Sequence, residues 1–319
     1  MNMFAVVIPY YQREPGVLRR TLASVATQDT RDSVSVYVVD DESPASPEPE
    51  IRATDWPAHI QCKLIKQANR GPGAARNRAF DSLEGEAFVA LLDSDDTWEP
   101  HHLSSARYAF DLGFDYYSAD TSTAVKGEQY HELFFPDGLP LSRVGSEIWG
   151  HRLDEPLIHF SVWRPIANSS SLVITRKLLG DARYRDELRY AGEDGLFNTT
   201  LAAKTPKVFI SQRIDVHLGR GVNILSEGDW GSSRAFMRSH HFLISRLLMR
   251  PLVRNADPAR AALRSVIRRA SEDFWMSAIA AARRKQLPAG LLFRTVAAHP
   301  STLRRLPKAL YRTVRRSSF

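Results

Sequence analysis

The sequence is poor in the features that mark secreted or membrane-spanning proteins. It has a single cysteine, Cys62, so no disulfide can form within the chain, and a reducing compartment fits this usage. No stretch approaches the roughly 18 consecutive apolar residues of a membrane span, because arginines interrupt the longest candidates. No basic leader precedes the first predicted strand, so we expect no signal peptide.

Several common catalytic motifs are also missing. The first predicted strand is followed by neither Gly-x-Gly-x-x-Gly nor Gly-x-x-x-x-Gly-Lys-Ser/Thr, which removes the main support for a dinucleotide-binding or P-loop protein. There is no Gly-x-Ser-x-Gly nucleophile elbow, and no histidines and cysteines have zinc-ligand spacing. Cys62 falls in the middle of a predicted strand, where we expect a core residue rather than a nucleophile.

What the chain does have is the composition of a folded globular protein with an uneven distribution of charge. Its 319 residues are 43% hydrophobic and 25% charged, which suits one large domain with an appendage. Residues 232–319 contain 19 lysines and arginines and three acidic residues, whereas residues 1–231 contain 24 basic and 33 acidic residues. An acidic body therefore carries a strongly basic C-terminal region, which is typical of contact with an anionic surface.

Strands and helices are predicted to alternate along the body. Short apolar runs rich in β-branched residues predict strands of a parallel sheet, at residues 4–9, 34–39, 60–66, 88–92, 114–118, 171–175 and 208–210. Apolar residues at helical spacing predict helices between them, at 17–26, 74–83, 99–113, 176–179 and 194–203. The pattern indicates an α/β fold whose mostly parallel sheet is flanked by helices. A helical region is expected from Ser232 onward.

Acidic residues cluster where two of these strands end. Asp40 and Asp41 follow the second strand, and Asp93, Asp95 and Asp96 follow the fourth. In open α/β sheets ligands bind at this edge, where carboxylates accept hydrogen bonds from a ribose or a base, or hold a hard divalent cation. Alternate residues of an extended segment point the same way, so Asp93 and Asp95 are expected to face one ligand. The alternative is a solvated acidic turn that caps the next helix.

Two arginines flank a glycine-rich turn that opens the next helix. Arg70 precedes and Arg76 follows the segment Gly71-Pro72-Gly73. Guanidinium groups match phosphate and carbonyl oxygens, and a helix N-terminus favours an anion. The pattern therefore indicates an anion contact, and the alternative is a turn with a surface arginine.

Five motifs in order resemble those of the GT-A glycosyltransferases of family 2. They are VIPYY at residues 7–11, VVDDES at 38–43, NRGPGAARN at 69–77, LDSDDTW at 92–98 and GED at 192–194. The resemblance extends over residues 3–220 and implies a GT-A fold, in which a Rossmann-like nucleotide-binding sheet is flanked by helices. It also implies a transferase that takes a sugar from a nucleotide diphosphate, usually UDP, with Mn²⁺ or Mg²⁺.

The resemblance assigns roles to individual positions. It implies that Asp95 is a metal ligand, and that His217, before a glycine-rich loop, contacts the metal or the diphosphate. Arg220 in that loop is a further phosphate candidate. The residues implied to contact the nucleotide sugar are Pro9, Tyr11 (stacked on the uracil), Asp41, Arg70, Arg76, Asp93 and Ser94.

By the same resemblance Asp194 is the general base, with Glu193 beside it at the acceptor or the sugar. One carboxylate base and no second nucleophile fit a single displacement that inverts the anomeric configuration. The alternative for Asp194 is an N-cap of the helix at 194–203. Trp163 is an acceptor candidate because an aromatic ring can stack on a sugar, with core packing as the alternative.

Residues 287–319 mix apolar and basic side chains. Leu303, Leu306, Leu310 and Val314 fall on one helical face, so this segment is predicted to lie on an anionic membrane surface. The alternative is a helix that packs on the body with a solvated basic face. Sparse aromatic residues and the absence of any supporting motif argue against nucleic-acid binding.

We therefore predict a GT-A catalytic domain over residues 1–230, with a donor-binding half (1–118) and an acceptor half (119–230), and a basic helical region at 231–319. Length and motif order are most similar to the glucosyltransferases of rhizobial succinoglycan-type exopolysaccharide. The predicted reaction is inverting, metal-dependent transfer of a sugar, first of all glucose, from a UDP-sugar to a lipid-linked saccharide. The predicted location is the cytoplasmic face of the bacterial plasma membrane. The alternative is a nucleotide-sugar-binding or membrane-recruited scaffold protein without catalysis.

Overall fold

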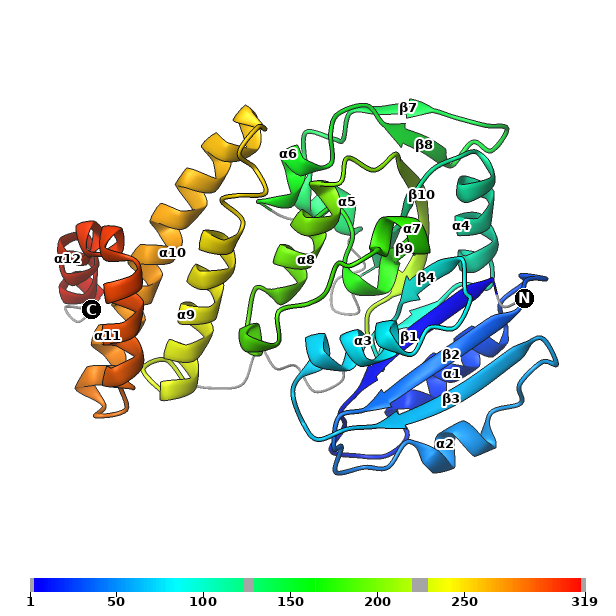
Figure 1. Cartoon of the computed structure of the whole chain (residues 1–319), viewed down its shortest axis with the longest axis horizontal. Coiled ribbons are helices and arrows are strands. Elements are labelled where there is room, and N and C mark those ends of the chain that lie inside the picture. The colour runs from blue at the N-terminus through cyan, green and yellow to red at the C-terminus, as the bar shows by residue number, and fades with distance from the viewer. Residues whose placement is uncertain (1–2, 123–128, 164, 220–228, 317–319) are drawn as a thin grey trace.

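The computed structural model describes residues 3–122, 129–163, 165–219 and 229–316, which form an α/β part and a helical part (Figure 1). Ten strands form one sheet in the order β3-β2-β1-β4-β9-β6-β10-β8-β7, with β5 paired to β10. The first four are parallel, so their carboxyl ends meet at one edge of the sheet. They are β1 (Phe4–Tyr10), β2 (Val34–Asp40), β3 (Ile60–Lys66) and β4 (Phe88–Leu91). The predicted α/β fold is confirmed.

Helices cover both faces of this parallel half, because successive strand residues point to opposite sides. On one face, Val7 of β1 belongs to a core that includes Ala79 of α3. On the other, Val6 belongs to a core that includes Leu22 of α1 and Leu103 of α4. The helices here are α1 (Val17–Ala26), α2 (Glu48–Ala53), α3 (Pro72–Asp81) and α4 (His102–Asp111).

The other half of the sheet mixes parallel and antiparallel strands. β9 lies antiparallel between β4 and β6, whereas β10 runs parallel to β6. The sequence predicts that this last strand ends at Ile210, but it continues through shifts in register to His217. Polar residues beyond Ile210 hide the extension. The strands are β5 (Thr97–Trp98), β6 (Tyr116–Ser122), β7 (Leu141–Arg143), β8 (Gly150–Leu153), β9 (Leu172–Thr175) and β10 (Val208–His217).

Short elements occupy much of the chain between β6 and α8. Each has three to five residues. The sequence predicts α7 at residues 176–179, and the other short helices have too few residues to show a helical period. The longer helix α8 begins one residue before its predicted start. These elements are α5 (Tyr130–Phe134), α6 (Ile158–Ser161), η1 (Ser169–Ser171), α7 (Arg176–Leu179), η2 (Asp186–Leu188) and α8 (Glu193–Ala202).

The helical part has a core of its own. Large buried side chains from two antiparallel helices, such as Phe236 and Phe274, form its centre. Ser232 caps its first helix by accepting a hydrogen bond from the Ala235 N–H at 3.1 Å. Figure 1 shows α9 and α10 beside the α/β part, with α11 and α12 farther out. The elements are α9 (Ser233–Leu248), α10 (Asp257–Arg283), α11 (Ala289–Ala298), η3 (Pro300–Arg305) and α12 (Leu306–Arg316).

The predicted apolar face of the C-terminal segment is divided in the structure. Leu306 packs against the helical core, whereas Leu303 and Leu310 are 45% and 46% exposed. The side chain of Val314 lies outside the described residues. Glu272 of α10 forms ion pairs at 2.8 and 2.9 Å with two basic residues of α12, Lys308 and Arg312. In the part of the chain that the structure describes, no helix is both long and apolar enough to cross a membrane.

Candidate active site

One buried arginine joins two of the acidic motifs. Arg76 of α3 is only 2% exposed. Its Nη2 donates to Oδ1 of Asp93 at 2.5 Å, and its Nη1 donates to Oδ1 of Asp194 at 3.1 Å. The guanidinium carbon lies 5.1 Å from the centre of the Tyr184 ring, which is a cation–π contact. Two carboxylates that are distant in the chain are thereby held at one point of the structure.

The two acidic residues of the GED motif lie in the first turn of α8. Burial raises the pKa of Asp194; the charge of Arg76 opposes this shift and that of Asp93 adds to it. The carboxyl group is still within reach of solvent, because the Asp194 side chain is 45% exposed. Burial and the Asp194 charge raise the pKa of Glu193 to about 8. Carboxyl groups with pKa values raised toward neutrality suit proton transfer.

The N-cap of α8 is a glycine, so the alternative of Asp194 as the helix cap is wrong. Gly192 has a φ of 86°, which disfavours any residue with a Cβ. A Cβ there would also lie 2.3 Å from Oγ of Ser245 in α9. The helical part therefore packs directly against the turn that carries the predicted base.

Asp41 holds the loop that leads into α3. Its Oδ1 accepts hydrogen bonds from the Arg70 N–H and from Nε2 of Gln67, and its Oδ2 accepts one from the Gly71 N–H, all at 2.8 Å. The Arg70 side chain itself forms an ion pair with Asp186. Asp41 is thus a structural anchor of this loop, and the nucleotide contacts of Asp41 and Arg70 remain predictions.

The other predicted nucleotide-binding residues lie along the same edge of the sheet. Pro9 is buried near the end of β1, opposite Val39 of β2, and Tyr11 follows it half-buried. Ser94 is 5% exposed, and its Oγ accepts a hydrogen bond from Nε2 of Gln12 at 3.0 Å. The convergence predicted from parallel strands is therefore present, while the contacts of these residues with a nucleotide stay predictions.

The end of β10 returns to the acidic segment after β4. A Cβ on Gly219 would lie 1.7 Å from the backbone oxygen of Asp95, so this approach requires glycine. The Gly219 N–H donates to Oδ1 of Asp96 at 2.8 Å. Burial, together with the charges of Asp93 and Asp95, raises the pKa of Asp96 to about 8. Three carboxyl groups are therefore concentrated where the resemblance places a metal.

The side chains present fit a hard divalent cation that also binds the substrate. Among the described residues, no three His, Cys, Asp or Glu side chains converge as a preformed cage. Mg²⁺ in nucleotide sites is often held by one or two carboxylates plus phosphates, and Asp93 and Asp95 supply such oxygens. His217 is less available, because its Nε2 lies 2.7 Å from Glu99 and its Nδ1 lies 2.7 Å from Ser122.

Trp163 follows α6 and is 52% exposed, so the alternative of core packing is wrong for this ring. An exposed indole is able to stack on a sugar, and its acceptor role stays a prediction. Arg220, the phosphate candidate of the glycine-rich loop, lies outside the described residues.

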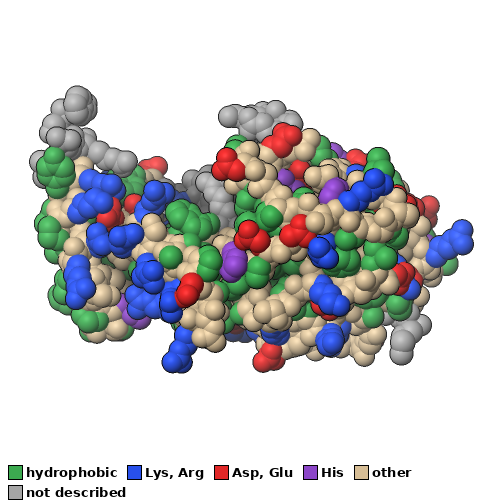
Figure 2. Space-filling view, turned by 90° about the horizontal axis from the view of Figure 1, so that it is seen from above, with side chains coloured by type: hydrophobic (Ala, Val, Ile, Leu, Met, Phe, Trp, Pro, Cys, Tyr) green, Lys and Arg blue, Asp and Glu red, His purple; other side chains and the backbone are tan. Residues whose placement is uncertain are grey.

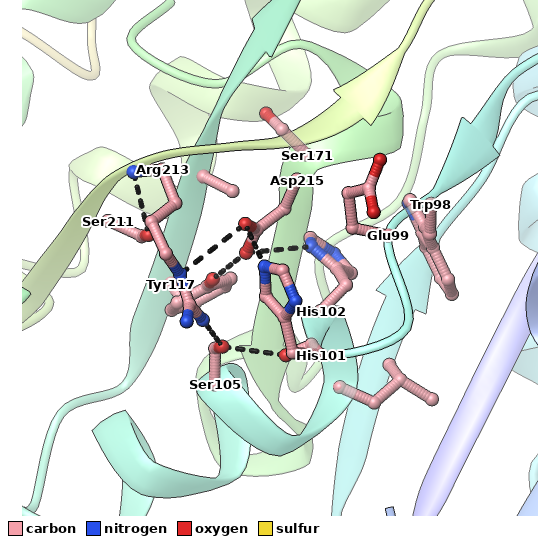
Figure 3. Close-up of polar contacts among 12 residues, drawn as sticks. Trp98, Glu99, His101, His102, Ser105, Tyr117, Ser171, Ser211, Arg213 and Asp215 are labelled. Atoms are coloured by element: carbon pink, nitrogen blue, oxygen red, sulfur yellow. Dashed lines mark hydrogen bonds and ion pairs between the residues drawn. The ribbon is translucent and has the colours of Figure 1, made fainter. Parts of the chain in front are cut away.

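The sequence analysis did not find a buried polar cluster that fixes β10 (Figure 3). Asp215 is fully buried and accepts a hydrogen bond from the Tyr117 hydroxyl at 2.9 Å. Nε2 of His101 lies 2.8 Å and Nδ1 of His102 lies 3.8 Å from its oxygens. Burial alone would raise the pKa of Asp215, but these contacts outweigh it and lower the pKa. Because the predicted strand ends at Ile210, no sequence pattern marks Asp215 as a residue inside a strand.

This fold and its acidic site define a GT-A glycosyltransferase. A profile described as "Glycosyl transferase family 2" matches residues 5–132. The chain is 32% identical over 297 residues to the succinoglycan biosynthesis protein ExoW of Rhizobium meliloti (strain 1021), covering 90% of this chain and 91% of that protein. The chain belongs to glycosyltransferase family 2.

Solved structures of glycosyltransferases share the fold. Residues 1–349 of TarS from S. aureus, in complex with UDP-GlcNAc, superpose with a TM-score of 0.60 at 20% identity, covering 86% of this chain and 72% of that one. The mannosyltransferase PcManGT from Pyrobaculum calidifontis, in complex with GDP-Man and Mn²⁺, gives a TM-score of 0.56 at 20% identity, covering 98% and 86%. The present chain covers 43% of the longer TarS chain.

Replacing Arg76 is expected to change the pH dependence of the reaction. Because the charge of Arg76 lowers the pKa of Asp194, Arg76→Gln raises that pKa further. A base must be deprotonated, so the fall in rate on the acid side should begin at a higher pH than in the wild type. The control is Arg78→Gln, which removes an exposed guanidinium from the same helix. An unchanged profile of kcat against pH in Arg76→Gln would contradict a base role for Asp194.

Gly219→Ala is expected to weaken binding of a UDP-sugar. The new Cβ cannot fit against the backbone oxygen of Asp95, so this segment must shift away from the position in which it is predicted to contact the donor. Gly85→Ala is the matched control, because nothing lies within 4 Å of a Cβ there. Affinity measured by calorimetry should fall for Gly219→Ala alone. Wild-type affinity in this variant would show that the contact with Asp95 does not shape the donor site.

Proposed function

We propose that this enzyme is an inverting, divalent-metal-dependent glycosyltransferase that moves a sugar, first of all glucose, from a UDP-sugar to a lipid-linked saccharide. The observation that carries the proposal is the Arg76 bridge between Asp93 and Asp194. This bridge brings Asp93, at the edge of the sheet where the nucleotide is proposed to bind, next to Asp194, whose pKa is raised. A transfer between two substrates needs this adjacency of a donor-side and an acceptor-side group.

In the proposed reaction Asp194 is the general base. Its carboxylate accepts the proton of the acceptor hydroxyl while the hydroxyl oxygen attacks the anomeric carbon. The raised pKa makes it a stronger base than an ordinary aspartate near neutral pH. With one displacement and no covalent sugar–enzyme intermediate, an α-linked donor gives a β-linked product. Glu193 and the exposed ring of Trp163 are proposed to orient the acceptor.

The donor is proposed to lie along the carboxyl edge of the parallel strands. Asp95, with His217 as a second candidate, would hold Mn²⁺ or Mg²⁺, which when bound stabilises the charge of the departing diphosphate. The support for UDP is the TarS complex with UDP-GlcNAc, and the support for Mn²⁺ is the PcManGT complex. The residues proposed to bind and orient the nucleotide sugar are Pro9, Tyr11, Asp41, Arg70, Arg76, Asp93 and Ser94.

The proposed acceptor and the proposed place of reaction are supported by the similarity to ExoW and by the distribution of charge along the chain. The name of ExoW links that protein to succinoglycan biosynthesis, so we propose a role in bacterial exopolysaccharide assembly on a lipid carrier. The basic segment 287–319 would contact the anionic inner face of the plasma membrane from the cytoplasm. We propose a catalytic domain over residues 1–230 and a basic helical region at 231–319 as the units that divide this work.

Asp194→Asn is expected to remove transfer while leaving UDP binding nearly intact. Loss of a general base costs about 10²–10⁴-fold in rate, whereas the nucleotide is proposed to bind elsewhere along the edge. Asp181→Asn is the control, because its side chain is 99% exposed and forms an ion pair with Lys204 outside the candidate site. The measurements are transfer rate and calorimetric UDP affinity. Full turnover by Asp194→Asn would remove this residue from the base role.

A further inference from the structure

A groove of about 810 Å³ opens in the helical part and shares no residue with the candidate active site. Its walls come from the turn after α9, from the first half of α10 and from η3. Figure 2 shows that Lys and Arg side chains gather over the helical side of the molecule. The groove therefore lies where the basic charge of the chain is concentrated.

The groove is lined by seven arginines and by no acidic side chain of the described residues. Three of them, Arg260, Arg264 and Arg268, follow one another at four-residue spacing on α10 and so share a helical face. Like charges at this spacing repel and destabilise a helix. These three arginines therefore destabilise α10 in the protein without a ligand. An anion bound between their guanidinium groups would relieve the repulsion.

The acidic residues that the structure describes nearby pair with two of the seven groove arginines and leave most of this charge unpaired. Asp257 forms an ion pair with Arg260 at the start of α10. Glu272 is already held by two residues of α12, and it lies 3.9 Å from Arg305 of the groove. Within the described residues, no carboxylate comes within ion-pair distance of the remaining groove arginines, which are Arg250, Arg254, Arg264, Arg268 and Arg304.

The floor of the groove is aliphatic. Val253 and Leu263 are buried there, and Ile267 is partly buried beside them. No aromatic side chain lines the groove in the described part of the chain, whereas sites for single-stranded nucleic acid commonly stack bases on aromatic rings. Leu303, which belongs to η3, is 45% exposed. Arginines above an aliphatic floor match a molecule with an anionic head and an apolar tail.

We propose that this groove binds the phosphate headgroup of an anionic membrane lipid. The guanidinium groups of α10 and η3 would hold the phosphate oxygens, and the aliphatic floor would contact the first part of an acyl chain. The inference goes beyond the transfer reaction, because lipid binding here needs none of the active-site residues. It also assigns the specific headgroup contact to α10 and to Arg304 and Arg305 of η3, within the broader basic surface that includes residues 287–319.

The test is binding of the full chain to vesicles of phosphatidylcholine, with and without phosphatidylglycerol. We expect binding only when phosphatidylglycerol is present. Arg264→Glu/Arg268→Glu should lose at least about tenfold in vesicle affinity, because each basic residue near the membrane surface contributes about 1 kcal/mol. The control, Arg269→Glu/Arg294→Glu, reverses two exposed charges outside the groove, one of them in the 287–319 segment. It should lose clearly less affinity than Arg264→Glu/Arg268→Glu does.

An equal loss of vesicle affinity in both double variants would contradict a specific site in the groove and indicate diffuse electrostatic attraction. Unchanged vesicle binding by Arg264→Glu/Arg268→Glu would also contradict the proposal. Inorganic phosphate and soluble short-chain phosphatidylglycerol would each be added as competitors of vesicle binding. Equally strong competition by the two would show that the site binds free phosphate and would contradict a lipid site. Stronger binding to an RNA oligonucleotide than to vesicles would also contradict it. UDP affinity and thermal melting check the fold of each variant, and Arg304→Gln/Arg305→Gln tests the opposite wall of the groove with a milder change.

Discussion

The site depends on the burial of one guanidinium group between two carboxylates. A buried arginine is stable only when its charge is paired, and the charge of Arg76 is paired with those of Asp93 and Asp194. These contacts join α3, the segment after β4 and the first turn of α8. They also set the pKa of Asp194, because the positive charge limits the rise that burial causes. The structure of the site and the proposed proton transfer therefore rest on the same interaction.

Much of the fold follows from local patterns in the sequence. The strand Ile60–Lys66 and the helix Val17–Ala26 have the predicted bounds, because a short apolar segment and apolar residues at helical spacing each indicate one structure. β7 and β8 have only three and four residues, so no period is visible in them. β10 extends past its apolar start because hydrogen bonds to β6, and the buried Asp215 cluster, support polar residues inside a strand.

The candidate site is predicted in outline but not in its contacts. Parallel strands bring Asp41 and Asp93 to one edge, as expected from their places at strand ends. The sequence gives no sign that Arg76 lies between Asp93 and Asp194, because that contact joins residues 118 positions apart. In the basic region, composition predicts an anionic partner. The three-dimensional packing of α10 against η3 creates the groove, which periodicity within residues 287–319 does not reveal.

A metal-dependent site for a UDP-sugar is the central claim, and it is tested most directly by release of UDP from a panel of UDP-sugars. Purified protein would be incubated with each sugar in the presence of Mn²⁺, Mg²⁺ or EDTA. We expect slow hydrolysis of one UDP-sugar with a metal present and none in EDTA, because a bound cation stabilises the leaving diphosphate. Equal release in EDTA, or no binding of UDP with either metal, would contradict the roles given to Asp41, Asp93 and Asp95.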